Sequence, residues 1–141
     1  LEPDPAEMEK RNIHLQKKYA EIEENEVRFE ELHCEDAEYL IVAFGSCARI
    51  AQKAMEIARE EGIKVGLLRP ITLWPFPSKA IAARAAQVKG ILTVELNAGQ
   101  MVEDVRLAVE CKVPVEHFGR LGGIVPDPDE VITALKEKLI K

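Results

Sequence analysis

Cys47 is the residue whose position most clearly allows covalent chemistry. It follows Gly45 and Ser46 at the end of an apolar run, and a cysteine in the first turn of a helix can have a lowered pKa and act as a nucleophile. Such a nucleophile needs a base. The histidines lie far from Cys47 in sequence: His14, His33 and His117. Arg49 also stands where a nucleophile elbow would have its second glycine. We therefore expect no catalytic residue in this chain.

The step Gly45-Ser46 could instead bind an anion, because backbone N–H groups and the dipole of a following helix favour negative charge. Arg49 and Arg120 could add positive charge at the same edge of a sheet, where the glycine-rich run 119–123 is also expected. An ordinary helix cap is the simpler interpretation, and a dinucleotide-binding fingerprint would need a further glycine. Gly45, Ser46, Arg49 and Arg120 are therefore weak candidates for an anion site.

Metal binding is not predicted. Cys34, Cys47 and Cys111 are far apart and include no Cys-x-x-Cys pair, and the histidines show no ligand spacing. This usage is typical of reduced thiols in a reducing compartment, which favours a cytoplasmic location. Glu95 is interpreted as a strand-end residue that is hydrogen-bonded to a neighbouring loop.

The loop 69–77 is too apolar for a segment that faces only water. It has three prolines, which stiffen it, and four large apolar residues: Ile71, Leu73, Trp74 and Phe76. Two interpretations remain open, since the loop could fold back over the sheet or dock on a partner. A buried tryptophan can contribute several kcal/mol to an interface. We therefore treat these four residues as interface candidates.

The elements around these residues alternate between strand and helix. Asp4 and Pro5 begin a helix to about residue 25, whose narrow apolar stripe indicates that it lies across the domain or reaches toward a neighbour. Strands are predicted at 26–33, 39–44, 63–68, 91–95 and 115–118. Helices are predicted at 45–61, 78–88, 97–110 and from 127 onward, with Asn97 and Gln100 as a capping box. We expect a connecting helix over 1–25 and one three-layer α/β/α domain over 26–141, with a mostly parallel sheet.

Length and composition exclude several classes of protein. The 141 residues suit one domain, and 47% of them are hydrophobic, as in ordinary globular proteins. A net charge of −6 argues against nucleic acid as a partner, and no apolar run is long enough to predict a membrane span. The chain begins with Leu1 rather than Met, so we expect that it was cut from a longer protein.

Four ordered segments of the chain resemble one enzyme family. They are YLIVAFGSCAR at 39–49, LRPITLWPFP at 68–77, VELNAGQMVEDVR at 94–106 and GRLGGIVPDPDE at 119–130. Together they are similar to the C-terminal domain of the α subunit of 2-oxoacid:ferredoxin oxidoreductases of the 2-oxoglutarate and 2-oxoisovalerate types. The chain departs from the family pattern at Cys47 and Asp127, where small or hydroxyl residues are common.

The resemblance implies a transketolase C-terminal-like fold, with five strands in the order 1-3-2-4-5 and an antiparallel first strand at the edge. It also implies an enzyme that uses thiamine diphosphate, magnesium, iron–sulfur clusters and coenzyme A to oxidise a 2-oxoacid and reduce ferredoxin. The thiamine motif and the cluster cysteines are absent from this sequence, so no cofactor is expected on this chain. The implied partners are the rest of the α subunit and the β and further subunits.

Three hypotheses about function remain. The first is a non-catalytic domain that helps to assemble a 2-oxoacid:ferredoxin oxidoreductase. The second is a stand-alone module that binds a small molecule or an anion through Gly45-Ser46, residues 97–99 and residues 119–123. The third is a hydrolase that uses Cys47 or Ser46, which the missing base makes weak. The apolar loop around Trp74 favours the first. Under the first hypothesis, the choice among 2-oxoacids cannot be read from this sequence, because the substrate pocket is expected to lie elsewhere in the enzyme.

Overall fold

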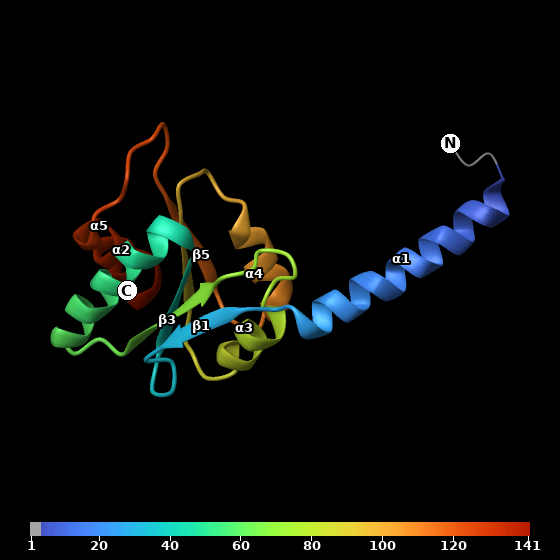
Figure 1. Cartoon of the computed structure of the whole chain (residues 1–141). Helices are drawn as coiled ribbons and strands as arrows, with labels where there is room; N and C mark the ends of the chain where they lie inside the picture. The colour runs from blue at the N-terminus through green and yellow to red at the C-terminus, as the bar shows by residue number, and fades with distance from the viewer. Residues whose placement is uncertain (1–3) are drawn as a thin grey trace.

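The structure is a computed structural model that describes residues 4–141. Five strands form one sheet: β1 (Phe29–Leu32), β2 (Tyr39–Ala43), β3 (Val65–Pro70), β4 (Ile91–Glu95) and β5 (Val115–Gly119). The helices are α1 (Pro5–Asn25), α2 (Gly45–Glu60), α3 (Ser78–Ala85), α4 (Met101–Val109), α5 (Pro128–Leu135) and a final π-helical turn, η1 (Lys136–Ile140). Figure 1 shows the sheet and its helices as one body, with α1 extending away from it.

The strand order is β1-β3-β2-β4-β5, which confirms the expected order. Strand β1 runs antiparallel to β3, with Phe29 opposite Pro70 and Leu32 opposite Leu67, whereas the other neighbours are parallel. The prolines at the two ends of the 69–77 loop, Pro70 and Pro77, are buried. The loop is therefore anchored next to the edge strand.

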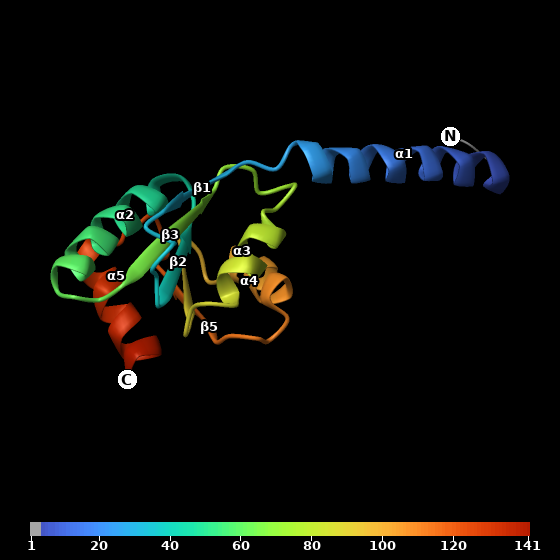
Figure 2. The ribbon, with the colours of Figure 1, turned by 90° about the horizontal axis from the view of Figure 1, so that it is seen from below.

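The central strands are apolar without interruption because both of their faces are covered. In β2, Ile41 and Ala43 pack into a cluster with α2 and α5, whereas Leu40 and Val42 pack into a second cluster with α3 and α4. Successive side chains of a strand point to opposite faces of the sheet, so alternate residues of β2 enter different clusters. Figure 2 shows the resulting three layers, with α2 and α5 on one side of the sheet and α3 and α4 on the other. The predicted α/β/α architecture is confirmed.

The helix α1 stands outside these layers, and none of its side chains from Pro5 to Asn25 is buried. Its residues Met8, Ile13, Leu15 and Tyr19 keep between 37% and 52% of their surface exposed. The Tyr19 ring contacts the Trp74 ring at a centroid distance of 5.8 Å, edge to face. Of the two expected placements, the helix takes the one that reaches outward (Figure 1). None of the helices formed by residues 4–141 has the length and apolar character that a membrane crossing requires.

Some element boundaries differ from the sequence prediction. The first strand starts at Phe29, not at residue 26, because the backbone of Arg28 bonds to Ile71 and Thr72 in the loop after β3. The helix α3 ends at Ala85, three residues earlier than expected. The last helix begins as predicted, since the Asp127 side chain accepts from the Glu130 N–H and the Glu130 carboxylate accepts from the Asp127 N–H, both at 3.1 Å.

Hydrogen exchange tests this division between a packed body and an unpacked helix. The amides of α1 have helical hydrogen bonds but no tertiary burial, so they should exchange at least about a hundredfold faster than those of β2, which open only with the whole domain. The packed helix α2 is the control and should exchange much more slowly than α1. Equal protection of α1 and β2 in mass-spectrometric exchange would contradict the packing described here.

Candidate functional site

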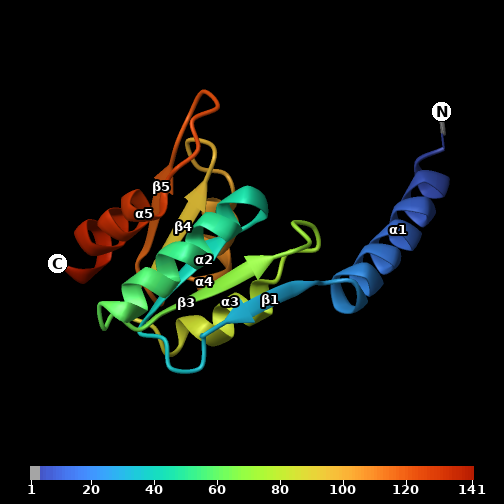
Figure 3. The same cartoon turned by 60° about the vertical axis from the view of Figure 1, so that its left-hand side comes forward.

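The carboxyl ends of the parallel strands are the edge where α/β folds usually bind ligands. The loops that leave this edge follow β2, β3, β4 and β5, at residues 44, 71–77, 96–100 and 120–127. Figure 3 shows the loops after β4 and β5 rising together beyond the ends of their strands, with the start of α2 beside them. All of the sequence-derived site candidates lie on these loops or on the start of α2.

Glu95, the last residue of β4, organises this edge although its side chain is only 1% exposed. Its carboxylate oxygens accept hydrogen bonds from the backbone N–H groups of Met101 at 2.8 Å, Val102 at 3.2 Å and Gln100 at 3.3 Å. It also accepts from the Asn97 side-chain amide at 3.2 Å. A negative group at a helix N-terminus satisfies free N–H groups and favours the helix dipole. Glu95 therefore caps α4 from inside the protein.

This arrangement corrects the predicted capping box at Asn97 and Gln100. Gln100 is the N-cap residue of α4, but its side chain makes no capping bond within the described part of the chain. Asn97 instead accepts from the Gly99 N–H at 2.8 Å, two residues later, which forms a local turn. The interpretation of Glu95 as a strand-end residue bonded to a neighbouring loop agrees with the structure.

His117 joins the same loop to the last strand. Its Nε2 lies 3.1 Å from the Asn97 carbonyl oxygen, and its Nδ1 lies 3.1 Å from Thr93 Oγ1 and 3.4 Å from Glu95 Oε2. A Cβ atom on Gly119 would fall 2.1 Å from that same carbonyl oxygen, so only glycine permits this approach. The histidine is thus a bonded, half-buried residue. Every buried side-chain nitrogen and oxygen in residues 4–141 has a hydrogen-bond partner.

Cys47 lies in the first turn of α2 and is 3% exposed. Burial raises the pKa of its thiol, and the nearby carboxylate of Glu95 raises that pKa further. Both effects hold the thiol in its protonated form at neutral pH, whereas a nucleophile needs the thiolate. These surroundings give no support to a nucleophilic role for Cys47.

The four anion-site candidates do not share one environment. Gly45, with a φ of +58°, and Ser46 are exposed at the start of α2, and Arg49 is exposed in the same helix. Arg120 lies after β5 and pairs with Glu130, which itself belongs to the capping box of α5. Gly45, Ser46 and Arg49 therefore lie together on α2, whereas Arg120 is held in an ion pair with Glu130.

The four interface candidates divide in a different way. Ile71, Leu73 and Trp74 are 52%, 48% and 56% exposed, whereas Phe76 is half-buried against the core on the α3 and α4 side. We call residues 71–77 the Trp74 loop. Its shape is held from inside, since Thr72 Oγ1 donates to the Pro75 carbonyl at 2.8 Å. An anchored loop thus presents three large apolar side chains to the outside.

Sequence reasoning missed a second group of exposed apolar side chains at the same edge. It lies on the loops after β4 and β5, and its members are 47–58% exposed: Leu96, Leu121, Ile124 and Val125. The sequence interpretation of 119–123 considered only its glycines. The signal that could have found this group is the spacing of large apolar residues within a loop that has no strand or helix pattern.

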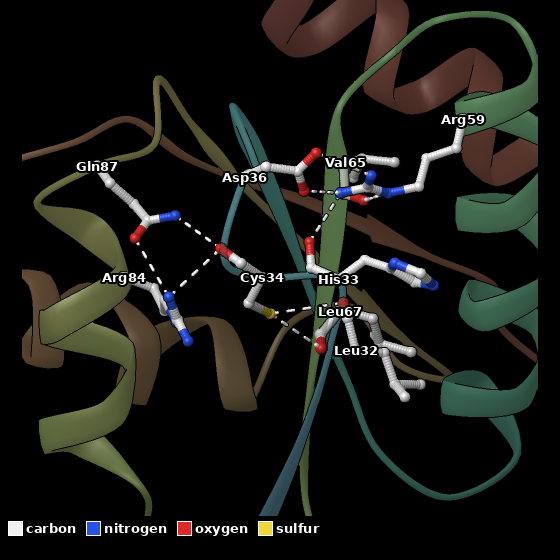
Figure 4. Close-up of polar contacts among 9 residues, drawn as sticks. All are labelled: Leu32, His33, Cys34, Asp36, Arg59, Val65, Leu67, Arg84 and Gln87. Carbon is white, nitrogen blue, oxygen red and sulfur yellow. Dashed lines mark hydrogen bonds and ion pairs between the residues drawn. The ribbon is translucent and has the colours of Figure 1, made fainter.

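The opposite edge of the sheet has a purely structural set of polar contacts, shown in Figure 4. Arg59, from α2, donates to the carbonyl oxygens of Val65 at 2.7 Å and His33 at 2.8 Å. It also pairs with Asp36 at 2.7 Å, and this hydrogen bond lowers the pKa of the Asp36 carboxyl group. Arg59 therefore fixes the turn between β1 and β2.

A second arginine, Arg84 from α3, reaches the same turn from the other face of the sheet. It pairs with Glu31 at 2.7 Å. It also donates to the Cys34 carbonyl at 3.4 Å, beside a hydrogen bond from Gln87 to that carbonyl at 2.7 Å (Figure 4). The Cys34 thiol is fully buried, and burial, followed by the charge of Glu31, raises its pKa to about 11. This thiol is not poised for chemistry. No cluster of three or more potential ligands in residues 4–141 could hold a metal ion.

The strand order, the antiparallel edge strand and the two helices on each face define the class of the fold. A split-gene transketolase has it too, with a TM-score of 0.68 and 20% identity over 80% of this chain and 41% of that chain. The chain therefore has the transketolase C-terminal-like fold that the sequence resemblance implies.

Within that class, residues 37–131 match the family described as pyruvate:ferredoxin oxidoreductase core domain II, and the chain belongs to this family. The ketoisovalerate oxidoreductase subunit VorB of Methanothermobacter thermautotrophicus is 49% identical over 93% of this chain. The 2-oxoglutarate synthase subunit KorA of Methanothermobacter marburgensis is 32% identical over 72%. The chain spans 37% and 27% of the lengths of these relatives. The resemblance to 2-oxoacid:ferredoxin oxidoreductases is confirmed.

A solved relative extends the comparison to the projecting helix. The 2-oxoglutarate:ferredoxin oxidoreductase from Magnetococcus marinus, with 2-oxoglutarate, coenzyme A and succinyl-CoA bound, is 26% identical with a TM-score of 0.83. The match covers 96% of this chain and 24% of that one. Because α1 has 21 of the 141 residues, a match of this extent includes most of it. The outward helix therefore has a counterpart in that enzyme.

The capping role of Glu95 can be tested by truncation. Replacing Glu95 by Ala leaves three backbone N–H groups of α4 without their acceptor, so urea denaturation should show a loss of about 3 kcal/mol in the free energy of unfolding. Glu103, exposed in the first turn of the same helix, is the matched control. Its change to Ala should cost no more than about 0.5 kcal/mol. Equal effects of the two substitutions would show that Glu95 is not the cap.

Proposed function

We propose that this chain is an assembly domain of a 2-oxoacid:ferredoxin oxidoreductase, which supplies docking surface for other parts of the enzyme and no catalytic group. The Trp74 loop is the observation that carries this proposal. Trp74 is 56% exposed, yet the loop around it is anchored by Thr72 and by two buried prolines, Pro75 and Pro77. Aromatic side chains on a pre-ordered loop bury a large area at little entropic cost.

The proposed whole enzyme oxidises a 2-oxoacid and passes the electrons to ferredoxin, with thiamine diphosphate, magnesium, iron–sulfur clusters and coenzyme A bound outside this domain. Its proposed partners are the rest of the α subunit and the β and further subunits, in the cytoplasm, without nucleic acid or membrane. We place 2-oxoisovalerate before 2-oxoglutarate as the substrate. The support is the higher identity to the ketoisovalerate oxidoreductase subunits, 47% and 49%, than to the 2-oxoglutarate synthase subunits.

An anion site at the start of α2 is a second candidate function. Within residues 4–141, no side-chain hydrogen bond from the N-cap residue Phe44 caps the free N–H groups at the start of α2. Ser46 and Arg49 are exposed at the same end of the helix. A phosphate group of coenzyme A is an anion that such a turn could bind. This site would not need Arg120, which is engaged by Glu130.

Calorimetry with coenzyme A tests the anion site. If the site exists, binding should weaken roughly three- to tenfold when Arg49 is changed to Ala, and should weaken again as salt screens the charge. Lys53, an exposed cation further along α2, is the control, and its change to Ala should have little effect. Binding that is insensitive to both salt and Arg49 would remove this candidate.

The assembly role of Trp74 can be separated from a role in stability. In the full subunit, changing Trp74 to Ala should weaken association with the remaining enzyme about tenfold or more, because it removes an anchor of the interface. The melting temperature of the isolated chain should hardly change, since Trp74 is 56% exposed and its ring packs edge to face on the partly exposed ring of Tyr19. Subunit association and thermal unfolding are both measured.

Phe76 is the matched control because it lies in the same loop but packs against the core. Its change to Ala leaves a cavity and should cost about 2 kcal/mol, which lowers the melting temperature of the isolated chain by several degrees. If Trp74→Ala lowers the melting temperature as much as Phe76→Ala and leaves association intact, the assembly proposal fails.

A further inference from the structure

A groove runs between the last turns of α1 and the Trp74 loop. It encloses about 720 Å³, and its apolar walls include Phe29, Trp74 and Phe76. Phe29 and Trp74 are 40% and 56% exposed, so much of their aromatic surface faces the groove or solvent. The edge-to-face contact between Tyr19 and Trp74 fixes the helix beside the loop. Most of α1 falls within the match to the solved oxidoreductase.

The helix wall of this groove is strongly acidic. Glu23 and Glu24 line the groove, with Glu21 and Glu26 close by in the sequence. The last turn of α1 has no basic residue. The negative end of the helix dipole lies at the same place, and it makes negatively charged side chains unfavourable there. Helix dipole and side chains together create a negative potential beside an aromatic surface.

Glu23 and Glu24 have no ion-pair partner within the described part of the chain. Arg28 lies 3.9 Å from Glu26, but neither Glu23 nor Glu24 forms an ion pair with any of the residues 4–141. Lys79 also lines the groove, from α3, without reaching these carboxylates. Two carboxylates that form no ion pair, next to aromatic faces, are the chemistry that recognises a cation with an apolar stem.

We propose that the groove receives a basic side chain, flanked by apolar residues, from another polypeptide of the assembly. Its aliphatic stem lies on Trp74 and its charged head reaches Glu23 and Glu24. An arginine suits the site best, because its planar guanidinium stacks on an aromatic ring and binds carboxylates. This inference rests on the proposed assembly function and names the chemistry of the partner at that surface.

Charge reversal in the full subunit, measured with its partner subunits, tests the inference. Glu23→Lys combined with Glu24→Lys should weaken association about tenfold and reduce its dependence on salt, because the attraction becomes repulsion. The control combines Glu9→Lys with Glu60→Lys, two exposed residues outside the groove. The control changes the net charge by the same amount and should alter association less than about twofold.

The outcomes separate this inference from the proposal on which it rests. Weaker association of the groove variant and an unchanged control support it, as does a cross-link from a photoreactive residue at Ser78 to a peptide of another subunit that contains Arg or Lys. A cross-link to a second copy of this chain, or to a peptide without a basic residue, overturns it. If Trp74→Ala weakens association but the groove variant does not, the inference fails and the assembly function stands. If neither variant weakens it, both fail.

Discussion

A single buried carboxylate holds the functional edge of this domain together. Glu95 ends the strand β4 and takes the place of the N-cap side chain that α4 lacks, by accepting three backbone hydrogen bonds and one from Asn97. Because the carboxylate is 1% exposed, these bonds are made where water competes little and where an unsatisfied N–H group is costly. The loop 96–100, the start of α4 and, through His117, the strand β5 all depend on it.

The two edges of the sheet consequently have different characters. At the amino ends of the parallel strands, Arg59 and Arg84 reach around the sheet from opposite faces and close one turn with hydrogen bonds. At the carboxyl ends, the Glu95 carboxylate forms its hydrogen bonds inside the protein, while large apolar side chains are exposed, and Trp74 is the largest of them. An edge that internal hydrogen bonds hold in place and that exposes apolar side chains is suited to docking. This supports a role in assembly.

The fold was largely predictable because its signals are local and redundant. Continuous apolar runs marked the strands covered on both faces, Asp127 and Glu130 marked the last helix, and the strand order followed from the resemblance. The site was less predictable. Asn97 and Gln100 have the spacing of a capping box, but the acceptor at the start of α4 is the Glu95 carboxylate. Only the folded course of the loop 96–100 brings the start of α4 to Glu95. Nor could sequence separate Phe76 from its exposed neighbours, since burial depends on which side of the loop meets the core.

The Trp74 loop should become covered when the enzyme assembles. Hydroxyl-radical footprinting of the isolated chain and of the complete enzyme purified from its native cells measures this directly, with the exposed Leu107 on α4, 77% accessible, as an internal reference. We predict that oxidation of Trp74 is at least about fivefold slower in the assembled enzyme, as expected for the buried centre of an interface, while Leu107 is oxidised at the same rate in both. Equal oxidation of Trp74 in the chain and in the complete enzyme would show that the loop stays uncovered and would contradict a role in assembly.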